Sequence, residues 1–112
     1  MAENIPTRPK RSEPRLQVVE PPAPPAHLTK ESGRIWAKIN EEWVLGPDSL
    51  PLLQAACESW DSYQAHRTTT LAEPTISSKS GMVRANPAAR MANDALREFR
   101  MCLRQLGLEP PK

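Results

Sequence analysis

The chain has 112 residues, of which 38% are hydrophobic and 25% are charged, and its formal net charge is +2. This length allows one folded domain, and no stretch approaches the roughly 20 apolar residues that a membrane-spanning helix needs. The amino-terminal residues also lack the apolar core of a secretory signal. We therefore expect one domain without a membrane partner, which remains in the cytoplasm where it is made.

Charge is unevenly distributed along the sequence. Residues 28–78 hold four basic and seven acidic side chains, which is a net charge of −3. Residues 79–112 hold seven basic and three acidic side chains, which is a net charge of +4. Positive charge is therefore concentrated towards the carboxyl end, where a polyanion would be attracted.

Residues 1–27 have the composition of a disordered tail. Prolines recur along this segment and end in the run PPAPP at 21–25, and repeated proline favours extended, solvated backbone over helix. The folded domain is therefore expected over residues 28–112. The basic side chains of the tail are candidates for a flexible DNA-binding arm, although glutamates are interspersed among them. These candidates are Arg8, Lys10, Arg11 and Arg15.

A first helix is predicted over residues 30–45. Thr29 is a suitable N-cap, and four apolar side chains after it fall on one face of a helix with 3.6 residues per turn. Gly46 is placed to end this helix in a left-handed conformation, Pro47 prevents its continuation, and Asp48 is expected to cap the next helix. The four apolar residues are Ile35, Trp36, Ile39 and Trp43.

A second helix of about six turns follows, with Pro51 tolerated in its first turn and Glu73-Pro74 ending it. Its apolar stripe is made up of Leu50, Leu53, Cys57, Trp60 and Leu71. The residues after Pro74 then change to the pattern of strand (75–77), turn (78–81) and strand (82–84). This pattern predicts a short β-hairpin or an ordered loop.

A third helix is predicted over residues 87–106. Asn86 is a suitable N-cap, Pro87 is tolerated as the first helical residue, and apolar side chains recur at helical spacing from Met91 onward. Gly107 suits a left-handed ending. The predicted fold class is therefore mainly α, a three-helix unit with a short β-hairpin or ordered loop between the second and third helices.

The predicted core is small for three helices, because the chain has one phenylalanine and three tryptophans. Such a unit is marginally stable alone, and self-association is a reasonable remedy. We therefore interpret four large apolar side chains as core or as oligomer interface, and for the three tryptophans we prefer core packing to base stacking. They are Trp36, Trp43, Leu53 and Trp60. Cys57 and Cys102 lie within apolar helical patterns, where reduced buried thiols are expected.

No local motif for catalysis or nucleotide binding is recognisable. The glycines are isolated, and the KSG sequence at 79–81 has the wrong order for a phosphate-binding loop. His27 and His66 have no neighbours at metal-ligand spacing. Asp94 and Glu98 lie four apart on one predicted helix, but without a third ligand we interpret them as surface charges. We expect neither an enzyme nor a metal or cofactor site.

Four arginines of the third helix fall within about 80° of one another, opposite its apolar residues. They are Arg90, Arg97, Arg100 and Arg104. Arginine makes bidentate contacts with phosphates or carboxylates. Three interpretations stay open: contact with the DNA backbone, contact with the acidic first helices of a neighbouring subunit, and a solvated surface. Lys79 and Arg84 in the predicted hairpin either extend this basic surface or belong to a polar turn.

Several short phrases occur in a characteristic order. After the proline-rich tail come PAHLT at 25–29, Trp36, Asp48 at the start of a long helix, SKSG at 78–81, Asn86-Pro87, and LGL at 106–108 before proline. In joint order and spacing the chain resembles the terminase small subunit of tailed bacteriophages. The resemblance covers about residues 25–110.

The resemblance implies a non-enzymatic, ring-forming homo-oligomer. It implies that this ring engages double-stranded viral DNA and delivers it to a large terminase subunit with ATPase and nuclease activity, in the cytoplasm of the infected bacterial host. The arginines of the third helix and the hairpin would then form the DNA-binding surface. The alternative is a helical protein-interaction module without DNA binding, whose second helix and proline-rich tail bind a partner protein.

Overall fold

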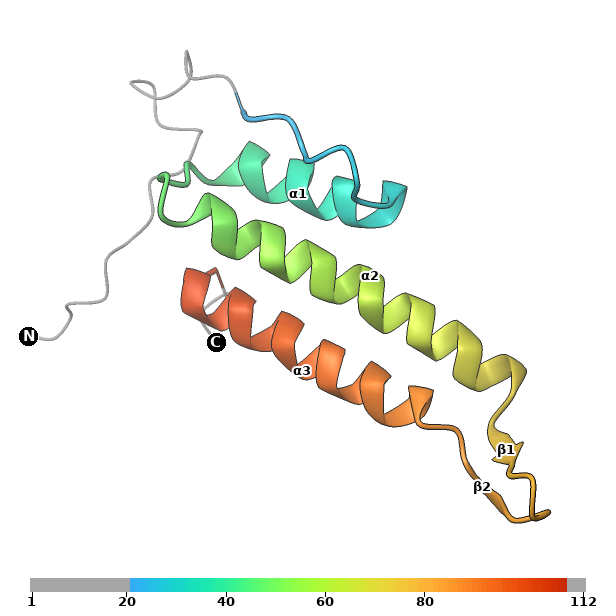
Figure 1. Ribbon diagram of the computed structural model, residues 1–112. Coiled ribbons are helices and arrows are strands. Elements are labelled where there is room, and N and C mark those ends of the chain that lie inside the picture. The colour runs from blue at the N-terminus through green and yellow to red at the C-terminus, as the bar shows by residue number, and fades with distance from the viewer. Residues whose placement is uncertain (1–20, 109–112) are drawn as a thin grey trace, which may run out of the picture.

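The computed structural model describes residues 21–108. Three helices, α1 (Lys30–Glu42), α2 (Leu50–Ala72) and α3 (Ala88–Leu106), lie side by side with α2 in the middle (Figure 1). Strands β1 (Thr75–Ser77) and β2 (Val83–Ala85) pair antiparallel and project beyond the far end of α2 and α3. The predicted fold class is confirmed, and the segment between α2 and α3 is a β-hairpin.

α1 begins as predicted but ends earlier. The Thr29 hydroxyl accepts a hydrogen bond from the backbone N–H of Ser32, as an N-cap does. The helix stops at Glu42, and Trp43 is extended, with φ −128° and ψ 150°. The predicted left-handed ending at Gly46 is wrong, because positive φ occurs among the described residues only at two later glycines. The early stop allows the extended chain to carry Leu45 into the core.

The starts of the other two helices each differ by one residue from the prediction. Ser49, not Asp48, occupies the N-cap of α2, and its backbone N–H bonds to the Gly46 carbonyl as part of a tight turn. In α3 the N-cap position is Pro87, although the Asn86 side chain still accepts the bond from the Ala88 N–H at 3.0 Å. The capping chemistry of Asn86 is therefore confirmed, with the boundary shifted by one residue.

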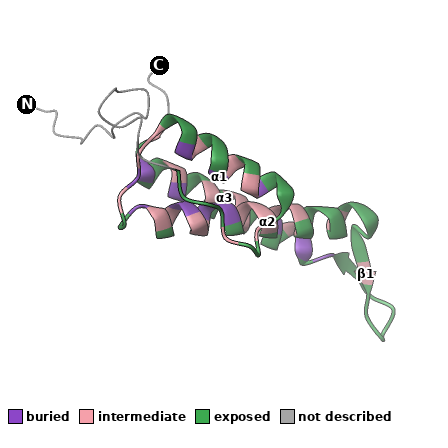
Figure 2. Ribbon diagram, turned by 90° about the horizontal axis from the view of Figure 1, so that it is seen from above, coloured by how far each residue is buried: buried purple, intermediate pink, exposed green. Residues whose placement is uncertain are grey.

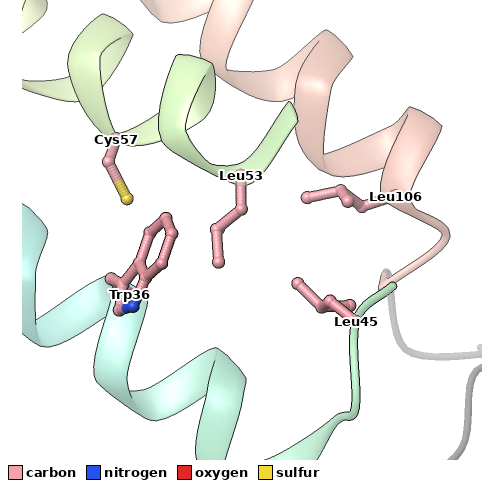
Figure 3. Close-up of a cluster of buried hydrophobic side chains, with 5 residues drawn as sticks. All are labelled: Trp36, Leu45, Leu53, Cys57 and Leu106. Carbon is pink, nitrogen blue, oxygen red and sulfur yellow. The ribbon is translucent and has the colours of Figure 1, made fainter. Parts of the chain in front are cut away.

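The hydrophobic core lies at the end of the molecule where α1 covers α2. Its buried side chains come from α1, α2, α3 and the α1–α2 connection, and Figure 3 shows them converging. They are Trp36, Leu45, Leu53, Cys57 and Leu106. Leu106 closes this core from the last turn of α3, where Gly107 adopts the predicted left-handed conformation with φ 72°. Both cysteines are buried and free, as expected.

Towards the hairpin, α2 and α3 have no third helix beside them, and their outward sides are exposed (Figures 1 and 2). Small residues such as Ala88 and Ala92 fill the contact between the two helices there. Leu71, which the sequence places on the apolar stripe of α2, is 70% exposed, and Met91 is 52% exposed. α2 is one continuous helix of 23 residues, but the 13 residues of α1 are too few to cover its second half.

Candidate nucleic-acid interface

The predicted basic side chains of α3 all lie away from the core. Ala92, Cys102 and Leu106 are buried on the inner side of the helix. The four arginines are exposed and lie on the outer side, since successive residues are rotated by about 100°. We call them the arginine face, which consists of Arg90, Arg97, Arg100 and Arg104. At about 1.5 Å per residue, this face is about 21 Å long.

The charge of the arginine face is not neutralised within the described part of the chain. Among the described residues, a carboxylate lies within ion-pair distance of a basic side chain at Glu58 and His27, and no carboxylate lies within that distance of an arginine of α3. Arg97, Arg100 and Arg104 instead border a shallow hollow of about 370 Å³, together with Asn93, Leu96 and Met101. Unpaired guanidinium groups around a hollow provide donors for an anionic ligand.

The hairpin carries the two other predicted basic residues. Arg84 is on β2 opposite Ile76, and Lys79 is in the turn; both are exposed. Gly81 closes the turn with φ 88°, a value that favours glycine. The turn is braced by its own hydroxyls, because the side chains of Ser78 and Ser80 lie 2.8 Å apart. The hairpin therefore places two further basic side chains beyond the start of α3.

One basic residue beside the arginine face was missed by the sequence reasoning. Arg67 of α2 is exposed and borders a hollow of about 200 Å³ with Tyr63, Leu71 and Asn93. Asn93 also borders the hollow of the arginine face, so the two basic regions adjoin. Sequence periodicity could not find this arrangement, because it does not say which sides of two helices meet.

A second feature, also not predicted, is an acidic groove between α2 and α3. The groove measures about 570 Å³ and is bordered by three carboxylates, small side chains, His66 and Met91. Its carboxylates are Glu58, Asp94 and Glu98, and its small side chains are Ala55, Ser59, Ser62 and Ala95. Among the described residues, no group of three or more side chains is arranged to hold a metal ion. The groove therefore places negative charge beside the arginine face without a metal centre.

A sequence model described as phage terminase, small subunit, matches residues 29–112. This chain belongs to that family. The match begins at the N-cap of α1 and includes all three helices and the hairpin. Neither a curated protein nor a solved structure matched the chain in the corresponding comparisons. Terminase small subunits of this family are generally non-catalytic.

The tryptophans of this terminase small subunit pack inside the folded chain. Trp36 is buried in the core with Leu53, and Trp43 packs half-buried against it. Trp60 is half-buried with its ring centre 5.1 Å from that of Phe99 and 5.4 Å from that of Tyr63. The contact with Phe99 holds α2 against α3, whereas Tyr63 lies on α2 itself. They favour core packing over base stacking for Trp36 and Trp60.

The candidate DNA-binding arm of this terminase small subunit lies outside the described residues. It comprises Arg8, Lys10, Arg11 and Arg15, and it stays a prediction from the sequence. The described chain begins at Pro21, and the carbonyl of Pro22 accepts a hydrogen bond from the Trp36 indole at 3.0 Å. None of the described helices is long and apolar enough to cross a membrane.

Proposed function

We propose that this terminase small subunit is a non-enzymatic adaptor that binds double-stranded viral DNA as a homo-oligomeric ring. In this role it delivers DNA to the large ATPase and nuclease subunit for genome packaging, in the cytoplasm of the infected bacterial host. The main support for this proposal is the arginine face. Its four exposed guanidinium groups have no carboxylate partner in the described part of the chain.

The dimensions of the arginine face suit the backbone of duplex DNA. Duplex DNA carries one negative charge per about 1.7 Å of its axis when both strands are counted, so about 21 Å of duplex carries about twelve phosphate charges, and those on the near side can meet the arginine face. Guanidinium groups bind phosphate oxygens with two hydrogen bonds each. Contacts of this kind position the protein on DNA without reading its sequence. Lys79 and Arg84 of the hairpin continue this backbone contact beyond Arg90.

A salt titration of duplex binding tests the arginine face. The variant combines Arg97→Ala, Arg100→Ala and Arg104→Ala, and its control combines Arg97→Lys, Arg100→Lys and Arg104→Lys, which keeps the charge. Loss of three phosphate contacts should reduce the slope of log affinity against log salt by about 3, since each contact contributes about 0.9. The lysine control should keep most of the slope.

Two results would contradict the assignment. An alanine variant that binds duplex DNA with the wild-type slope would show that these arginines do not contact phosphates. A wild-type chain that binds no duplex DNA at low salt would favour the protein-interaction module instead. Light scattering on each variant separates loss of DNA contact from loss of assembly.

A further inference from the structure

The β-hairpin carries apolar side chains that the folded chain leaves in solvent. Met82 is 72% exposed and Val83 is 66% exposed, and every residue of β2 is exposed. The hairpin projects beyond the ends of α2 and α3, away from the hydrophobic core (Figure 1). These two side chains are therefore free to contact a partner outside the chain. A hairpin of two strands is marginally stable alone in water, so a partner that covers it would also stabilise it.

The tip of the hairpin is held in one conformation by its own hydrogen bonds. The backbone N–H of Ser78 donates to the Met82 carbonyl at 2.8 Å, so the pairing of the strands continues one residue beyond β2. The Met82 N–H donates to the Ser78 hydroxyl at 3.2 Å, and the Gly81 N–H donates to the Ser78 carbonyl at 3.0 Å. Met82 therefore starts from a fixed position at the tip, and its binding costs less ordering of the chain.

Apolar side chains lie on both sides of the hairpin near its tip. Side chains alternate between the two sides of a strand, so Met82 and Arg84 lie on one side and Val83 lies on the other. Lys79 is in the turn between the strands. Two strands about 4.8 Å apart form a ribbon slim enough to follow a groove of duplex DNA. The tip is thus an apolar wedge with one basic side chain in the turn and another on β2.

Only basic charges accompany this wedge along the chain. Residues 74–93, which include the hairpin, hold three basic and no acidic side chains. The nearest carboxylates along the chain are Glu73, at the end of α2, and Asp94, within α3. Like charges oppose the approach of the same hairpin from a second copy, whereas they attract a polyanion. Duplex DNA is the polyanion of the proposed function.

We propose that the hairpin enters the minor groove of duplex DNA, inserts Met82 between two base pairs and bends the duplex. Proteins that bind the minor groove use methionine and other apolar side chains in this way, and the partly unstacked step kinks the duplex. A duplex held by the arginine face reaches the hairpin beyond Arg90, at the start of α3. Lys79 and Arg84 then contact phosphates beside the groove. The proposal rests on the DNA binding in the proposed function, to which it adds the groove and a change in the shape of the DNA.

The energetics of insertion predict which DNA is preferred. Unstacking a base step costs free energy, and burial of Met82 and Val83 offsets much of that cost. The cost is lowest at pyrimidine–purine steps such as TA, which kink easily, and it is high in stiff A-tracts. A duplex with a central TA step should therefore bind more tightly than an A-tract duplex of the same length.

Energy transfer between dyes at the two ends of a duplex of about 30 base pairs measures the bend in complexes with the full chain. Wild-type chain should raise the energy transfer of a duplex with a central TA step, and Met82→Ala should lose this increase. Met82→Leu, which keeps an apolar wedge, should retain it. Met91→Ala is the matched control and should also retain it, because Met91 is an exposed methionine of α3 that borders the acidic groove. Circular dichroism checks that each variant is folded.

Two further measurements locate the insertion. The fluorescence of 2-aminopurine placed at the TA step should rise when wild-type chain binds, because unstacking relieves its quenching, and Met82→Ala should abolish this rise. Distamycin, which occupies the minor groove, should abolish the bend. Met82→Ala should keep the wild-type slope of log affinity against log salt, because it removes no phosphate contact. It should lower the affinity by less than about tenfold, because the lost burial and the avoided unstacking oppose each other.

The outcomes separate this proposal from the proposed function. Wild-type chain that binds the duplex through the arginine face without bending it overturns the insertion and leaves the adaptor role standing. Folded Met82→Ala that bends the duplex as the wild type does also overturns the insertion, and so does a bend that persists with distamycin. If Met82→Ala keeps the bend but weakens assembly in sedimentation without DNA, Met82 belongs instead to a contact between copies. Wild-type chain that binds no duplex at low salt overturns both proposals.

Discussion

Asp61 of α2 caps the amino terminus of α1. Its carboxylate accepts hydrogen bonds from the backbone N–H of Thr29 at 3.1 Å and from the Thr29 hydroxyl, and the Ser32 hydroxyl bonds to it at 2.9 Å. A carboxylate at a helix amino terminus satisfies free N–H groups and interacts favourably with the helix dipole. One residue therefore both stabilises the start of α1 and holds that helix on α2.

Asp61→Ala should lower the free energy of unfolding by about 1 kcal/mol, in the range of lost N-caps. The expected cause is loss of the hydrogen bonds at Thr29 and Ser32. Urea denaturation followed by circular dichroism measures the change. Glu73→Ala is the matched control, because Glu73 is exposed at the end of α2 and its side chain makes no bond to α1. Equal stabilities of the two variants would contradict the capping role.

Leu53→Ala should lower the free energy of unfolding by about 2–5 kcal/mol, because a fully buried leucine leaves a cavity when it is truncated. Leu71→Ala removes the same atoms from the same helix, but its side chain is 70% exposed. This control should change stability by less than about 0.5 kcal/mol. Thermal denaturation of dilute protein compares the two. A large cost at Leu71 in dilute protein would contradict its exposure in the folded chain.

Cys57 should not react with thiol reagents while the chain is folded. Burial, and then the charges of Asp61 and Glu58, raise the pKa of this thiol to about 12, and its side chain is fully buried. At pH 8 roughly one thiol in ten thousand is then ionised, and only the thiolate reacts. Burial also raises the pKa of Cys102. The rate at which a thiol reagent labels Cys57, measured with and without urea, tests this prediction. Rapid labelling of Cys57 in the folded chain would contradict it.

Glu58 should contribute to stability at neutral pH and lose that contribution in acid. Hydrogen bonds from Gln54 at 3.0 Å and His27 at 2.7 Å lower its pKa below the ordinary 4.5. The folded chain then binds this proton more weakly than the unfolded chain. The stabilisation is complete above the ordinary pKa and disappears as the pH falls through the lowered one.

The difference in melting temperature between wild type and Glu58→Gln, followed from about pH 7 to about pH 3, measures this contribution. It should be small, because the side chain is 45% exposed and solvent screens its contacts. Glu31→Gln is the control, since Glu31 is exposed on α1. A difference that grows as the pH falls would contradict the assigned sign.

The sequence by itself determined the features that depend on neighbouring residues. Thr29 caps α1, Gly107 ends α3 in a left-handed conformation, and the turn before Val83 forms a hairpin, as predicted. Caps, turns and helical periodicity depend on chemistry within a few residues. The arginine face belongs to the same class, because one helix suffices to align its members.

Only the tertiary structure decided which helix sides are covered. Leu71 continues the apolar stripe of Leu53, yet it is exposed, because α1 ends its cover of α2 before reaching it. Glu58 and Asp94 are 36 residues apart in sequence, and the packing of α2 on α3 places both at one groove. Periodicity shows which residues share a side of one helix. The packing of neighbouring helices determines whether that side becomes core, groove or exposed surface.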